Sequence, residues 1–131
     1  MRKPILCLDF DGVVNSYKSG WQGVDAIPDP PTEGFFEWLA TAMPHFRIAI
    51  FSSRSSSEDA RKSMQGWLWM HYREWLCTAP SAAPIPIDEI EFPAEKPPAM
   101  ISLDDRALTF NGDWSEFSPA RLLGFKPWNK R

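Results

Sequence analysis

Three short apolar segments along the first 105 residues each lead directly into polar residues. They span residues 4–8, 47–51 and 100–103. Short, mainly apolar runs of this kind are typical of strands buried on both faces of a parallel sheet. We therefore expect three buried strands, each opening at its carboxyl end into a polar loop.

Two amphipathic segments separate these runs. Apolar residues recur at helical spacing over about 32–43, with Thr32 as the expected N-cap, and over about 57–77, after candidate caps at Ser55–Ser57. Strand and helix thus alternate, which predicts an α/β fold with a mostly parallel central sheet and right-handed crossovers.

The remaining segments are less regular. Residues 12–31 are rich in Gly, Pro, Ser and Asp and predict an irregular loop. Residues 85–92 have the composition of a short strand, interrupted by proline. A turn near 111–113 and a short helix near 119–123 complete the expected elements.

Composition narrows the class of protein. A length of 131 residues with 44% hydrophobic residues fits one globular domain over 1–131. The net charge of −3 gives no support to nucleic-acid binding, and we interpret the basic tail 126–131 as a solvated terminus.

The two cysteines form no metal-binding motif, and Cys7 fits a small core residue. Without a signal-like or membrane-spanning apolar run, we expect a cytoplasmic protein that does not contact membranes.

Acidic and hydroxyl side chains follow the three predicted strands. Asp9 and Asp11 follow the first, Ser52 the second, and Asp104 with Asp105 the third. Because the carboxyl ends of parallel strands meet at one edge, we expect these side chains to gather there.

Such a group of carboxylates favours a divalent cation, because unpaired like charges repel and are costly to bury. Mg2+ takes oxygen ligands and leaves coordination sites for water and phosphate. Lys96, just before the third strand, and Ser52 are candidates to bind phosphoryl oxygens, and Gly12 lets the backbone turn closely around them. One N-terminal aspartate would attack phosphorus while the other transfers protons.

The sequences Leu8-Asp9-Phe10-Asp11-Gly12, Ile50-Phe51-Ser52, Lys96 and Ile101-Ser102-Leu103-Asp104-Asp105 resemble, in order, the four motifs of the haloacid dehalogenase (HAD) superfamily. The resemblance implies a Rossmann-like three-layer sandwich and a phosphatase that acts through an aspartyl-phosphate.

Specific roles follow from the resemblance. It implies that Asp9 is the nucleophile, that Asp11 is the general acid/base, and that Ser52 and Lys96 bind phosphate. It also implies that Mg2+ is bound by Asp9, Asp104 and the Asp11 main chain, with Asp105 in support. Val13 departs from the threonine that many family phosphatases carry.

The chain has no room for the cap domain common in this superfamily, because only a loop and one helix separate the motifs. An open site suits a bulky phosphorylated substrate, such as the end of a macromolecule, or a partner subunit acting as a lid. A nucleic-acid end fits this description, although net charge does not support it. Asp113 and Trp114 are placed to border the site, and Arg54 either reaches the phosphate or lies on the surface.

Three other classes of protein share features of this pattern. In receiver domains the lysine follows the last acidic residues, and in Toprim nucleases the Asp-x-Asp comes late, so motif order disfavours both. A catalytically inactive HAD-like module that binds phosphate or a partner remains the alternative to an enzyme.

Overall fold

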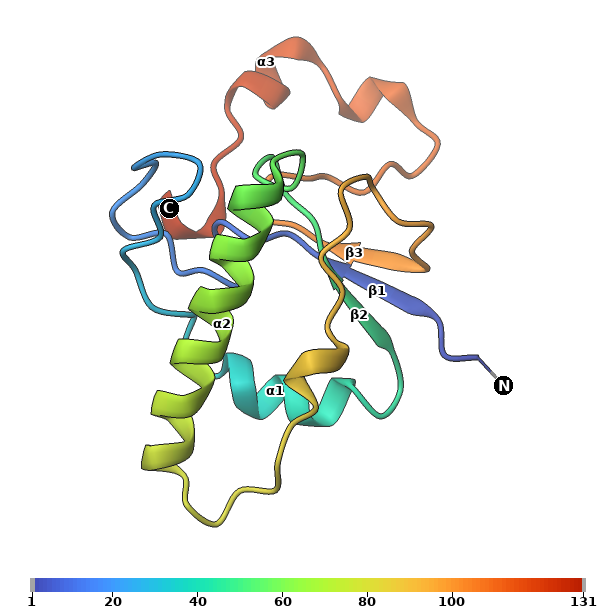
Figure 1. The fold of residues 1–131 in the computed structure, drawn as a ribbon. Coiled ribbons are helices and arrows are strands. Elements are labelled where there is room, and N and C mark those ends of the chain that lie inside the picture. The colour runs from blue at the N-terminus through green and yellow to red at the C-terminus, as the bar shows by residue number, and fades with distance from the viewer. Residues whose placement is uncertain (1, 131) are drawn as a thin grey trace.

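The computed structural model describes residues 2–130 and is built around a small parallel sheet (Figure 1). Strands β1 (Ile5–Leu8), β2 (Arg47–Ile50) and β3 (Ile101–Leu103) pair in the order β2-β1-β3, with β1 in the centre. The α/β class with a parallel sheet is therefore confirmed.

One face of the sheet carries the hydrophobic core. Helices α1 (Phe35–Ala42) and α2 (Glu58–Thr78) contribute to the same buried cluster as the side chains of β1 and β2. The two helices also contact each other, since the Phe36 ring lies 5.7 Å from that of Tyr72. On the central strand, Leu6 and Leu8 alternate with Cys7, which is buried as expected.

The predicted N-cap of α2 is confirmed and that of α1 is wrong. The Ser57 hydroxyl accepts a hydrogen bond from the Ala60 amide. Helix α1 instead begins after Gly34, whose φ of 85° suits glycine. The Thr32 hydroxyl donates to the Val13 carbonyl, so Thr32 fastens the preceding loop rather than the helix.

The predicted strand within 85–92 is reduced to a single bridge. The prolines leave a short helix, η1 (Ile87–Glu89), followed by Glu91, which pairs with Ala49 at the outer edge of β2. The chain thus moves from β1 to β2 to Glu91 in one direction. Right-handed crossovers in one direction place both helices on the same face of the sheet.

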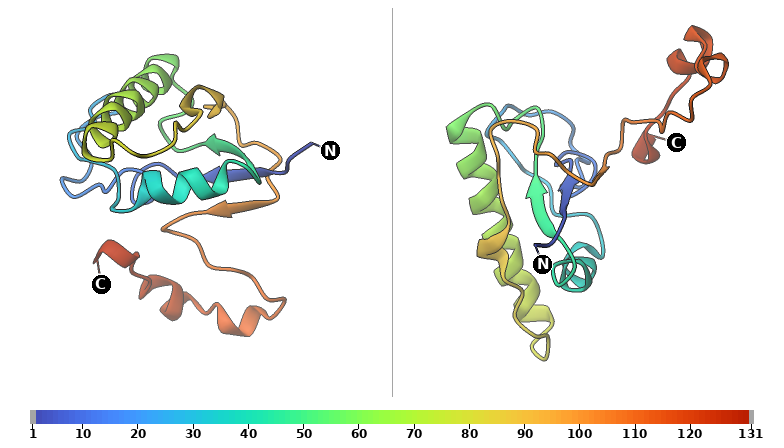
Figure 2. Two further views of the ribbon diagram at one scale, coloured as in Figure 1. Left: turned by 90° about the horizontal axis from the view of Figure 1, so that it is seen from below. Right: turned by 90° about the vertical axis from the view of Figure 1, so that its right-hand side faces the viewer.

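The prediction that the third strand is buried is wrong. Ile101 and Leu103 are 51% and 42% exposed. This follows from the path of the chain, because residues 106–130, here called the C-terminal arm, extend away from the helices (Figure 2). The arm contains η2 (Trp114–Glu116), α3 (Pro119–Leu123) and η3 (Trp128–Lys130). The expected helix at 119–123 is confirmed. Among residues 2–130, no helix has the length and apolar character needed to cross a membrane.

Residues 12–31 form the expected irregular loop, and it is closely tied to α2. The Asp29 carboxylate accepts hydrogen bonds from the amide and the hydroxyl of Ser19. The Asp29 carbonyl accepts one from the indole N–H of Trp67 on α2. The loop therefore has a defined position beside the carboxyl end of the sheet.

Candidate active site

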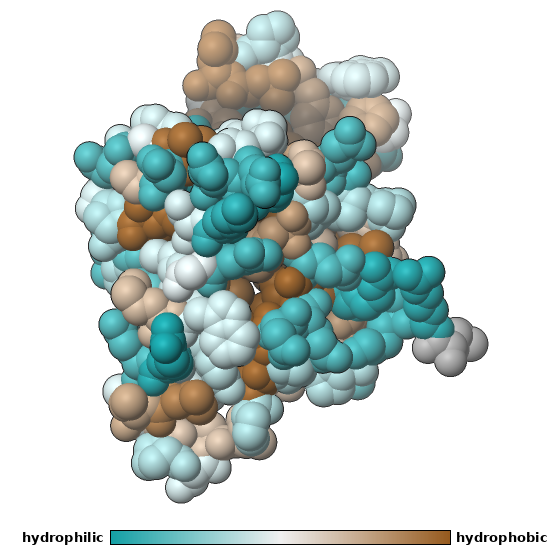
Figure 3. All heavy atoms as spheres, viewed as in Figure 1, coloured by the Kyte–Doolittle hydropathy of each residue, from teal (hydrophilic) through white to brown (hydrophobic). Residues whose placement is uncertain are grey.

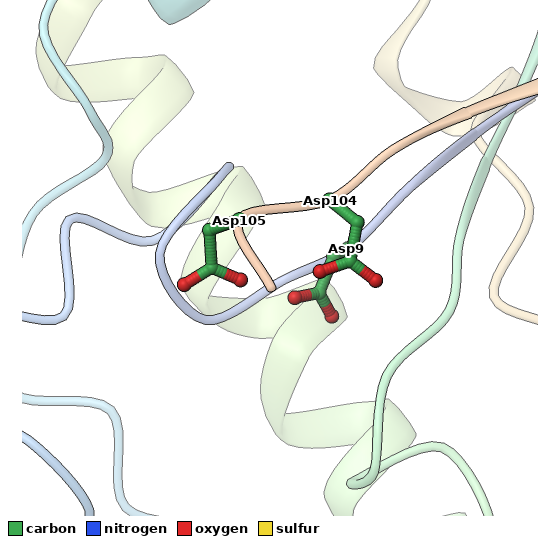
Figure 4. Close-up of side chains that lie close together, drawn as sticks. All are labelled: Asp9, Asp104 and Asp105. Atoms are coloured by element: carbon green, nitrogen blue, oxygen red, sulfur yellow. The ribbon is translucent and has the colours of Figure 1, made fainter. Parts of the chain in front are cut away.

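The pairing of β1 with β3 brings three carboxylates together. Leu8 pairs with Leu103, and the Asp9 amide donates to the Leu103 carbonyl at 2.9 Å. The residues that follow are Asp9 on one strand and Asp104 with Asp105 on the other. One oxygen from each of these three carboxylates lies within 4.8 Å of the others (Figure 4).

Asp9 has the most strongly perturbed electrostatic environment. Burial, followed by the negative charge of Asp104 and the contact with the Asp105 carboxyl, raises the pKa of Asp9 to about 8. All three effects disfavour the charged carboxylate. A cation placed among the three groups would favour the charged form and so oppose this shift.

Asp105 offers an oxygen that has no protein partner. Its side chain is only 3% exposed, and its Oδ1 is buried without a hydrogen-bond partner among the described residues. Buried carboxylate oxygens are normally satisfied. A free buried oxygen beside two further carboxylates is the donor set that Mg2+ binds, so the residues present fit this ion.

The side chain of Asp11 does not join this cluster. Its Oδ2 accepts from Arg54 Nε at 2.9 Å, and its Oδ1 accepts from Arg54 Nη2 at 3.1 Å and from Asn15 Nδ2 at 2.9 Å. The two aspartates of the Asp-x-Asp run thus have different surroundings. Asp9 faces other carboxylates, and Asp11 faces a guanidinium.

Arg54 is the residue whose place the sequence left open. It is 1% exposed, so the interpretation as a surface arginine is wrong. Besides Asp11, its Nη1 donates to the carbonyls of Gly23 and Val24 at 2.8 and 2.9 Å, and its guanidinium lies 4.6 Å from the Trp21 ring. Arg54 therefore fixes both Asp11 and the loop that borders the site. An arginine at a strand end opposite an Asp-x-Asp run is the only sequence signal for this role.

Ser52 and Lys96 are placed differently from each other. Ser52 is buried at the end of β2, where its hydroxyl accepts from the Arg54 amide at 3.1 Å. Lys96 is exposed, and its charge acts to lower the pKa of Cys7 on β1, against the larger effect of burial. Ser52 thus lies at the carboxyl edge with the aspartates, while Lys96 lies within electrostatic range of β1.

Gly12 is in contact with the acidic cluster. Its φ is 85°, and a Cβ at this position would come within 2.2 Å of Asp105 Oδ2. Its amide donates to the Asn15 carbonyl at 2.8 Å. The lack of a side chain at Gly12 therefore makes room for Asp105.

Comparison of the chain with protein-family models, curated proteins and solved structures gave no match. The resemblance to the HAD superfamily remains a prediction from the motifs. The chemistry of the site is therefore argued from its geometry.

Gly12→Ala is expected to destabilise the protein more than Gly20→Ala. Both glycines have positive φ, 85° and 70°, so both substitutions strain the backbone. Only at position 12 does the new methyl collide with Asp105, whereas a Cβ at Gly20 meets no atom within 4 Å. Urea unfolding should show an extra loss of about 1–3 kcal/mol for Gly12→Ala, the usual cost of overpacking. Equal losses would contradict the close approach of Asp105.

Arg54→Met is expected to cost about 3–5 kcal/mol in the free energy of unfolding, because it leaves the largely buried Asp11 carboxylate without its partner. Arg47→Met is the matched control. It breaks the Arg47–Glu91 pair, whose side chains are 30% and 44% exposed, and should cost about 1 kcal/mol or less. Urea unfolding of both variants measures the difference. Similar losses in the free energy of unfolding for the two variants would contradict a buried Arg54–Asp11 pair.

The raised pKa of Asp9 predicts a pH-dependent effect of Asp9→Asn. A carboxyl whose pKa is higher in the folded state contributes stability below the unfolded value, and this is lost as pH rises through about 8. Asp9→Asn stays neutral, so its melting temperature relative to wild type should increase from about pH 5 to about pH 9 in a chelating buffer. The exposed Asp88→Asn should give a flat difference over the same range. If the melting-temperature difference between Asp9→Asn and wild type is also independent of pH, the pKa of Asp9 is not raised.

Proposed function

We propose that this protein is a Mg2+-dependent phosphomonoester hydrolase of the HAD type, with a Rossmann-like fold, acting through an aspartyl-phosphate. One observation carries the proposal: three carboxylates from two paired strand ends converge within 4.8 Å, and one buried oxygen among them has no hydrogen-bond partner within residues 2–130. Phosphoryl transfer depends mainly on positioning and on neutralising charge, and a site of this kind supplies both once a cation is bound.

Asp9, Asp104 and Asp105, with the Asp11 main-chain carbonyl, would hold Mg2+, which supplies positive charge to the phosphoryl oxygens. The Asp9 carboxylate oxygen attacks phosphorus, and the bond from phosphorus to the ester oxygen breaks. The Asp11 carboxyl gives its proton to the leaving alcohol and then takes one from the water that attacks the aspartyl-phosphate. The products are the alcohol and inorganic phosphate, and Asp9 is regenerated.

The roles proposed for Asp11, Ser52 and Lys96 each require a local change. Both Asp11 oxygens are engaged with Arg54 and Asn15, so one of them must exchange its partner when substrate binds. The Ser52 hydroxyl caps the Arg54 amide and would turn towards phosphate. Lys96 is exposed and on a long, flexible stem, which lets it approach an anion bound at the strand ends.

The test is hydrolysis of a panel of phosphomonoesters with Mg2+ or with a chelator. Wild type should turn over at least one substrate in a Mg2+-dependent way, and Asp9→Asn should lower kcat/KM by on the order of a thousandfold or more, because it removes the nucleophile. Asp104→Asn should raise the Mg2+ concentration needed for half-maximal rate. Asp88→Asn, an exposed carboxylate away from the cluster, should stay within about twofold of wild type.

Two outcomes would contradict the proposal. Turnover that survives Asp9→Asn would exclude the aspartyl-phosphate. Inactivity on the whole panel would favour the second candidate, a HAD-like module that binds phosphate without catalysis. The engagement of both Asp11 oxygens by Arg54 and Asn15 is the observation that favours this second candidate.

A further inference from the structure

The C-terminal arm is fastened at both ends to the candidate active site. It begins at Arg106, directly after Asp105. At its other end the indole N–H of Trp128 donates to the Gly12 carbonyl at 2.8 Å. Between these points the arm extends away from the helices, as both views in Figure 2 show. Both ends of the arm therefore lie beside the acidic cluster, and Arg106 at its start is the direct link to Asp105.

The arm lines an open surface cavity of about 440 Å³, within the range of small-molecule sites. Its lining is mostly aromatic and aliphatic, and two of the rings, Phe110 and Trp114, lie 4.6 Å apart. These two side chains are 49% and 78% exposed. Figure 3 shows apolar side chains gathered where Figure 1 places α3. The lining residues are Arg106, Ala107, Leu108, Phe110, Trp114, Phe117, Leu122 and Phe125.

Charge distinguishes the arm from the rest of the chain. Residues 106–130 contain four basic and two acidic side chains, a net charge of +2. Residues 1–105 contain nine basic and fifteen acidic side chains, a net charge of −6. The overall value of −3 conceals this difference. An anionic ligand would be repelled by the acidic body and attracted by the arm.

We propose that the arm cavity binds the base of a nucleotide substrate whose phosphate lies at the three carboxylates; the inference rests on the proposed function and names its substrate class. Exposed aromatic side chains combined with positive charge are the features that bind nucleotides through stacking and attraction. Arg106 joins the two parts of the site. It lines the cavity, and its Nε lies 4.0 Å from Asp105 Oδ2.

The occupant has to be both flat and anionic. A purely apolar partner would not use the Arg106 guanidinium that lines the cavity, and a small alkyl phosphate would not fill about 440 Å³. Stacking of one base on an aromatic side chain strengthens binding roughly five- to a hundredfold. Trp114 is the side chain to test, because its exposure of 78% makes its removal harmless to folding.

The experiment compares adenosine 5′-monophosphate with ribose 5-phosphate, which lacks only the base, and measures adenosine binding by calorimetry. Wild type should show a kcat/KM at least about fivefold higher for the nucleotide, and Trp114→Ala should reduce this preference and weaken adenosine binding by a similar factor. Trp69→Ala is the matched control, because Trp69 is 40% exposed on α2 and does not line the cavity. It should leave both quantities within about twofold.

The outcomes separate this inference from the proposed function. Equal kcat/KM for the two phosphates, with adenosine binding absent or insensitive to Trp114→Ala, would overturn the inference while hydrolysis stands. Adenosine binding that depends on Trp114, without hydrolysis of either phosphate, would support the base site and refute the phosphatase. A wild-type dimer that Trp114→Ala makes monomeric, with no preference for the base, would overturn the inference and assign the arm to self-association.

Discussion

Repulsion among three carboxylates at the ends of β1 and β3 is the constraint on which the site depends. The parallel register fixes it, because pairing of Leu8 with Leu103 leaves the next residues, Asp9 and Asp104, side by side. The adjacent side chain, that of Asp105, is almost fully withdrawn from water. Like charges so close in a partly buried place disfavour ionisation, and the pKa of Asp9 is accordingly raised to about 8. Protonation of a carboxylate relieves this repulsion, and a cation bound among the three groups would relieve it without protonation.

The negative charge of Asp11, unlike that of Asp9, is balanced by a cationic side chain. A buried guanidinium provides Asp11 with two parallel hydrogen bonds, a geometry that holds a carboxylate firmly. Arg54 also binds the carbonyls of the loop at Gly23 and Val24, so the same side chain orients the loop. Two aspartates separated by one residue therefore differ in environment. In the proposed reaction Asp9 has to attack as a carboxylate and Asp11 has to deliver a proton, so a cation beside Asp9 and a change of partner at Asp11 must reverse this difference.

The sequence was sufficient for features that depend on local patterning. The apolar runs located β1 and β2, and Ser57 was correctly among the candidate caps of α2. Predictions from the sequence failed where contacts between distant parts of the chain determine the burial or the partners of a side chain. Thr32 is not the N-cap, because α1 begins only after Gly34, and its hydroxyl instead donates to the Val13 carbonyl 19 residues away. Leu103 looked buried because apolar character does not reveal whether another layer covers a strand. The burial of Arg54 depends on a partner 43 residues away, which no local pattern encodes.

The arm shows why averaged charge is a poor guide to ligands. The electrostatic field of an exposed charge is screened within about 8–10 Å at ordinary ionic strength. An approaching anion therefore responds to the charged side chains near the site and not to the net charge of the whole protein. Arg106 at the start of the arm brings one positive side chain to the edge of the acidic cluster, where its Nε lies 4.0 Å from Asp105 Oδ2. Because Trp128 returns the arm to Gly12, both ends of the arm stay beside the three carboxylates. A metal would neutralise the carboxylates from within, and the arm offsets the charge of the body from outside.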